Sequence, residues 1–185
     1  MTQAEQEARE RALSYIRSKA ELAPTVVHEQ VAAAFASLNT VLAEVAIAGA
    51  RVRPAAAEWS PQEVVDHLVE TFRPGVDELR CLLAGEDVPG EPIPASLRSK
   101  APHLRPWRWL LEELRRSQRD VLDLLAGVPD GFAAKARAPI VMVVNVPGGA
   151  PLEWIEALEW KAYALVSWRL HTIDHMKQIK RALAR

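Results

Sequence analysis

The chain has 185 residues, of which 49% are hydrophobic and 25% are charged, and this composition is typical of one globular domain with its own core. Because 23 Lys and Arg are balanced by 24 Asp and Glu, no overall positive charge would attract a nucleic acid. The single cysteine, Cys81, excludes an internal disulfide bond, and the N-terminal residues are too polar for a signal peptide. No apolar stretch reaches the roughly 18 residues that cross a bilayer. We therefore expect a cytoplasmic protein without a nucleic-acid or membrane partner.

Two helices are expected in the first fifty residues. Residues 2–21 are rich in Ala, Glu and Arg, and they predict a helix with only a weak apolar face. From Pro24, a residue suited to a helix start, apolar side chains recur at intervals of three and four up to Gly49. This second segment predicts a bundle helix with one buried stripe, made of Val27, Val31, Ala34, Phe35, Leu38, Val41, Leu42 and Val45.

The third helix has the clearest start in the sequence. Ser60 can cap it, Pro61 suits its first position, and Glu63 completes a capping box. The helix is expected to run to about residue 83, with a kink or break at Pro74, which cannot donate a backbone hydrogen bond. Residues 85–106 contain five prolines and predict an irregular loop.

A fourth helix is predicted over residues 107–125 and a last one from about residue 152 to the C-terminus. Between them, the β-branched run near residues 139–146 predicts a short extended segment. The amphipathic helices together predict an all-α fold, a four-helix bundle over residues 23–185 with an extra N-terminal helix, residues 1–22, appended to it.

Three histidines occupy positions where a bundle helix would place core residues. His171 and His175 are four residues apart and lie in one stripe of the last helix, so both imidazoles can reach one metal ion. His67 lies on the inward face of the third helix. Three nitrogen donors from two facing helices would hold Zn²⁺ or a similar divalent ion and leave a position for water or substrate. The alternative is that the rings are packed in the core and hydrogen-bonded without a metal.

Two carboxylates are candidates for proton transfer at such a site or for orienting its ligands. Glu70 is three residues after His67, and Asp174 is three residues after His171. The alternative for both carboxylates is a solvated helix face.

Two short motifs resemble those of the DinB/YfiT-like metalloenzymes. EWSPQEVVDHLVE, residues 58–70, resembles the Trp-Ser-hydrophobic-His-Leu start of that family's second bundle helix, and HTIDHMKQIKR, residues 171–181, resembles its C-terminal His-x-x-x-His-x-x-Gln signature. The resemblance extends over residues 26–185. It implies a four-helix bundle, often dimeric, in which His67, His171 and His175 hold a divalent metal, commonly zinc or nickel.

The same resemblance implies a class of reaction, because characterised relatives use low-molecular-weight thiols such as mycothiol, bacillithiol or glutathione. The first hypothesis is therefore a thiol-dependent S-transferase, in which the metal activates a thiol that attacks an electrophilic small molecule. A metal-dependent hydrolase needs the same ligands. The second hypothesis is a non-catalytic bundle whose histidines form a structural or sensing site for a metal or small ligand. A homodimer is a further expectation from the family.

Overall fold

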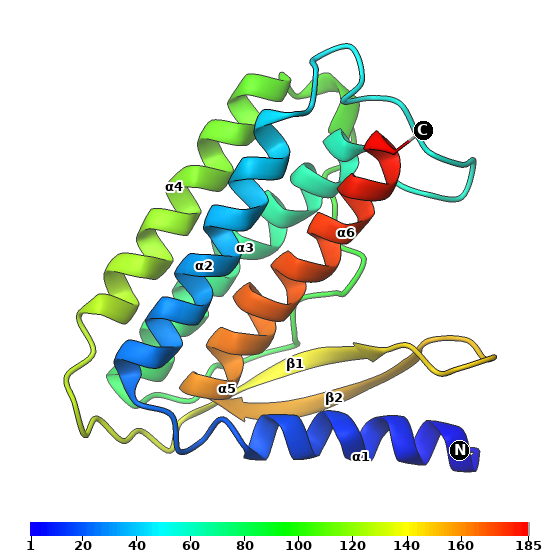
Figure 1. Cartoon of the computed structure of the whole chain (residues 1–185). Coiled ribbons are helices and arrows are strands. Elements are labelled where there is room, and N and C mark those ends of the chain that lie inside the picture. Colours follow the sequence, from blue (N-terminus) through cyan, green and yellow to red (C-terminus); the bar gives the residue numbers. More distant parts are fainter. Residues whose placement is uncertain (185) are drawn as a thin grey trace.

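The computed structural model describes residues 1–184 of the chain, and Figure 1 shows a bundle of helices with a small hairpin at one end. The last bundle helix is continuous and contains a π-helical stretch between two α-helical parts. The bundle consists of α2 (Pro24–Ala43), α3 (Pro61–Ala84), α4 (Trp107–Ala126), and the final helix, made of α5 (Trp160–Ala164), the π-helical stretch (Leu165–Leu170) and α6 (His171–Leu183). The predicted helical bundle is thus confirmed.

The core lies where the apolar stripes of the bundle helices meet. Phe35 of α2 and Phe72 of α3 are both buried, and their ring centroids are 5.7 Å apart. Leu38, Leu68 and Leu114 are completely buried around them. The stripe that the sequence predicts for α2 is the stripe that the structure buries.

Helix α3 begins as its sequence predicts. Ser60 and Glu63 form the capping box, and Pro61 occupies the first turn. The helix continues through Pro74 to Ala84, so the expected break is absent. Gly85 ends it in the left-handed conformation, with φ of 80°, which glycine adopts without a steric penalty.

The start of the last helix is a correction to the sequence prediction. Residues Leu152–Glu159 form a strand, β2, antiparallel to β1 (Arg137–Val144), and the helix begins only at Trp160. The register pairs Val144 with Leu152 and Arg137 with Glu159. An isolated extended segment would leave its backbone hydrogen-bonding groups without partners, so the segment near residues 139–146 requires a second strand beside it. Burial alternates from residue to residue along β2, which is the two-residue period of a strand with one face buried.

The predicted N-terminal helix, α1 (Gln3–Arg17), lies along the hairpin at the end of the bundle (Figure 1). Ala8 is buried, the Arg9 guanidinium lies over the Trp154 ring, and the Tyr15 hydroxyl accepts a hydrogen bond from Arg169 at 3.0 Å. A two-stranded hairpin is marginally stable alone, so this cover stabilises it. Within residues 1–184, no helix has both the length and the apolar character that a membrane crossing requires.

Candidate metal centre

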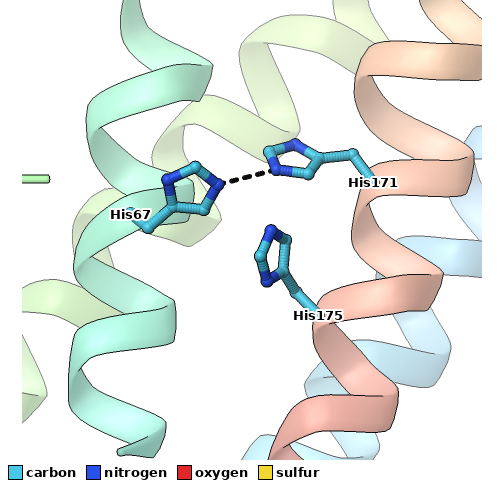
Figure 2. Close-up of side chains that lie close together, drawn as sticks. All are labelled: His67, His171 and His175. Carbon is cyan, nitrogen blue, oxygen red and sulfur yellow. Dashed lines mark hydrogen bonds between the residues drawn. The ribbon is translucent and has the colours of Figure 1, made fainter. Parts of the chain in front are cut away.

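The three predicted ligands come together between α3 and α6. Figure 2 shows His67 from α3 facing His171 and His175 from α6, with the three rings directed at one another. One nitrogen donor from each ring lies within 4.8 Å of the other two, and Nε2 of His67 is 2.8 Å from Nε2 of His171. The three histidines therefore form a group that could hold a metal ion.

The outer nitrogens of these rings show where their protons lie. Nδ1 of His67 donates to the backbone carbonyl of Leu97 at 2.6 Å, and Nδ1 of His171 faces the carbonyl of Ser167 at 3.3 Å. Nδ1 of His175 donates to the amide oxygen of Gln178. Because these oxygens are placed to accept, the proton of each neutral ring belongs on Nδ1. Each Nε2 then carries a lone pair directed at the shared centre, and a bound cation would relieve the contact between two such lone pairs at 2.8 Å.

Burial keeps these imidazoles neutral at pH 7. Desolvation lowers the pKa of His67, and it lowers the pKa of His171 well below the usual value, helped by the neighbouring rings. Desolvation and the proximity of His67 bring the pKa of His175 to about 3. The neutral ring is the form that binds a metal ion.

The loop at residues 97–106, which supplies the Leu97 carbonyl, is attached to α3 by buried polar side chains. Asp66 is completely buried and accepts hydrogen bonds from the backbone N–H and the hydroxyl of Ser99, both at 2.8 Å, and from Arg105 at 3.1 Å. Gln62 donates to the carbonyls of Pro102 and Arg105. This face of α3, which a sequence reading would assign to solvent, thus fixes the loop that orients His67.

Glu63 adds a second attachment for the same loop. It is 1% exposed and accepts hydrogen bonds from Arg53 and from Arg98 of the loop. Burial alone would raise the pKa of Glu63, but the hydrogen bonds from Arg53 and Ser60 outweigh it and lower that pKa to about 2. Arg98 in turn lies over the ring of Trp59, 4.5 Å from the ring centre.

Trp59 covers the histidine cluster on the side of this loop. Its ring is parallel to that of His175, with centroids 6.1 Å apart, and it lies 5.1 Å from that of His67. Phe72 lies 6.2 Å from His171. The rings therefore lie in a partly apolar environment, which strengthens metal-ligand electrostatics.

The two predicted proton-transfer residues lie apart from the cluster. Glu70 is bound by Arg105 at 2.6 Å and is not among the side chains that line the cleft described next. Asp174 lines that cleft, is 72% exposed and pairs with Lys177 at 3.0 Å. Neither carboxylate hydrogen-bonds to a histidine of the cluster, and their catalytic roles stay predictions.

The histidines open into a cleft of about 1030 Å³, which is large enough for a small organic molecule. Helices α3 and α6 form two of its walls, and the hairpin, α1 and residues 93–96 form the others. Strand β1 contributes Ile140 and Met142, which make that wall apolar. The hairpin that the sequence only half predicted is thus a wall of the cleft.

Sequence reasoning did not find the groups around the histidines. The carbonyls of Leu97 and Ser167 act through the backbone, which carries no sequence signal. Trp59 directly precedes the capping box, but an aromatic residue beside a helix start does not by itself indicate that its ring packs over a functional site.

Comparison with known proteins identifies the family of the chain. No curated protein is significantly similar to it. The family description that matches is the DinB superfamily, over residues 30–179. This range contains α3, the hairpin, α6 up to Ile179 and all three histidines. The chain therefore belongs to the DinB superfamily.

Proposed function

We propose that the protein is a metal-dependent enzyme that binds a divalent ion, zinc or nickel, through His67, His171 and His175 and acts on a small molecule in the adjoining cleft. One observation supports the metal most directly: one nitrogen of each ring lies within 4.8 Å of the other two, while the Nδ1 atom of each ring has an oxygen acceptor outside the cluster. Among residues 1–184 the group contains only these three side chains, so a fourth position is available to substrate or water.

Thiol-dependent S-transfer is the reaction we propose for this site. A divalent ion here would lower the pKa of a thiol bound to it. The chain's own residues would do the rest: Trp59 and Phe72 exclude water beside the rings, and Ile140 and Met142 hold an apolar part of the substrate. Asp174 is the candidate carboxylate that borders the cleft, and we propose it as the group that exchanges protons with solvent at the mouth.

Metal content tests the first part of this proposal. The protein is purified without a histidine tag and analysed for metals beside His171→Ala and the control His28→Ala, whose histidine lies on α2 outside the cluster. We expect about one ion per chain in wild type and in His28→Ala, and a large loss in His171→Ala. If wild type neither contains metal nor binds added Zn²⁺ or Ni²⁺, the proposal is wrong.

The reaction is tested on the metal-loaded protein with mycothiol, bacillithiol or glutathione and a set of electrophiles, in parallel with ester and amide substrates. Thiol-dependent turnover that disappears in His171→Ala supports the transferase. Turnover of esters or amides without a thiol would instead show that the protein is a hydrolase.

A non-catalytic metal site is the second candidate, and one observation favours it. The histidines hydrogen-bond to two carbonyls and an amide, and no carboxylate within residues 1–184 hydrogen-bonds to them. This candidate predicts that metal raises the melting temperature but that no substrate turns over.

A further inference from the structure

The cleft has a second polar group, far from the histidines. Glu78 of α3 and Tyr163 of α5 both line it, and the Tyr163 hydroxyl donates a hydrogen bond to Oε2 of Glu78. Eleven residues separate His67 from Glu78, which corresponds to about 16 Å along a helix. The cleft therefore has histidines at one end and a carboxyl-phenol pair at the other.

Among the buried and half-buried carboxylates of α3, Glu78 differs because it has no cationic partner within residues 1–184. Glu63, Asp66 and Glu70 each pair with an arginine, whereas Glu78 accepts a hydrogen bond from the uncharged Tyr163. Burial raises the pKa of Glu78, although the hydrogen bond from Tyr163 opposes this shift. A partly desolvated carboxyl group in a cleft, without a counter-charge, is typical of a ligand-binding position.

The backbone of α3 comes close to this pair at Gly75, one turn before Glu78. A Cβ atom there would be 3.4 Å from the Tyr163 hydroxyl and 3.5 Å from the Trp168 ring, which is already van der Waals contact. A longer side chain at this position would displace them, so glycine lets Tyr163 and Trp168 pack directly against α3 and fixes the hydroxyl beside Glu78.

Tyr163 is held so that its hydroxyl donates to Glu78. Its ring is buried and packs edge-on against Trp168, with centroids 5.3 Å apart. Burial and the adjacent Glu78 raise the pKa of Tyr163 well above its usual value, so the hydroxyl keeps its proton. It occupies one oxygen of Glu78 and leaves the other for a donor on a ligand.

We propose that Glu78 and Tyr163 form a binding subsite for an ammonium group, so that ligands of this cleft carry a primary amine at the end remote from the histidines. An ammonium group supplies both what Glu78 lacks, a positive charge, and what its second oxygen can accept, an N–H donor. The subsite belongs to the cleft of the proposed function but does not require a metal ion.

The test compares three probes that share a six-carbon chain: hexylamine, hexanol and hexanoate. Binding to the full chain is followed by NMR through the indole N–H of Trp168, which lies beside the pair. We expect hexylamine to bind at least about tenfold more tightly than the other two probes. Equal binding of hexylamine and hexanol, or no binding of hexylamine, overturns the proposal, and this comparison needs no variant.

Variants then assign the effect to Glu78. Glu78→Gln keeps the size of the side chain and is expected to weaken hexylamine binding at least about tenfold. The control Glu112→Gln, an exposed glutamate of α4 outside the cleft, should bind as wild type does. Unchanged hexylamine binding by a folded Glu78→Gln would refute the assignment. Each titration is run without and with Zn²⁺, so the ammonium subsite is tested even if the protein binds no metal.

Discussion

Replacing Asp66 by asparagine tests whether the attached loop orients the metal centre. Asp66 has both oxygens occupied, by the N–H and hydroxyl of Ser99 and by Arg105, and it is completely buried. Asparagine keeps one acceptor oxygen and turns an NH₂ group toward donors. At least one buried donor of the loop then loses its acceptor.

The magnitude follows from these contacts. A buried donor without an acceptor costs about 1–3 kcal/mol, and the weakened charged hydrogen bond to Arg105 adds a similar amount. We expect the free energy of unfolding to fall by about 3 kcal/mol. Ser99 is two residues from Leu97, whose carbonyl holds His67, so metal affinity should fall about 10- to 100-fold as the ring loses its orientation.

Urea unfolding of the metal-free protein measures the first effect, and competition with a chromophoric chelator measures the second. Asp77→Asn is the matched control, because Asp77 lies on the same helix, is 75% exposed and pairs with Arg80 one turn away. Its expected cost is below about 0.5 kcal/mol. If Asp66→Asn matches wild type in both measurements, the loop does not position His67.

Three further predictions concern pH, metal removal and packing. Because the pKa of Glu63 is lowered from 4.5 to about 2, its contribution of about 3 kcal/mol to stability is complete above pH 4.5 and disappears as the pH falls through 2. Urea unfolding from pH 7 to 2 should show this slope, and a slope equally steep in Glu63→Gln would contradict it. Wild type with metal at 100 times its Kd should be about 3 kcal/mol more stable than wild type stripped of metal by a chelator. Calorimetry should find no such difference for His171→Ala. Phe35→Ala should cost about 3–5 kcal/mol, because it empties space against Phe72 in the core, and a cost below about 1 kcal/mol in urea would contradict this packing.

The sequence predicts those parts of the fold whose signal lies within one element. The apolar stripe of α2 and the capping box of Ser60 and Glu63 are local, and the structure has both. The histidines could be assigned to one site because their phase on two helices puts them where core residues belong. The capping box is recognised from its residue types, and the stripe and the histidines are recognised from helical periodicity, so each signal lies within single helices.

The parts that could not be predicted depend on partners distant in the sequence. Leu152, Trp154 and Leu158 share the more buried face of β2, but a strand forms there only because β1 is available to pair with it. Asp66 has the sequence pattern of an exposed carboxylate and is buried because the loop folds over it. Arg105 of the same loop forms an ion pair with Glu70, and no local sequence pattern predicts that pair.

The π-helical stretch Leu165–Leu170 has a geometric consequence for the final helix. Tyr163, Ser167, His171 and His175 are spaced four residues apart and all line the cleft. In a regular α-helix each four-residue step overshoots a full turn by about 40°, so three steps would rotate the last side chain about 120° away from the first. Within the stretch the backbone N–H of His171 reaches the carbonyl of Val166, five residues earlier, and this wider turn offsets the overshoot. Deleting one residue there would leave each end helical but aim the two ends of the cleft in different directions.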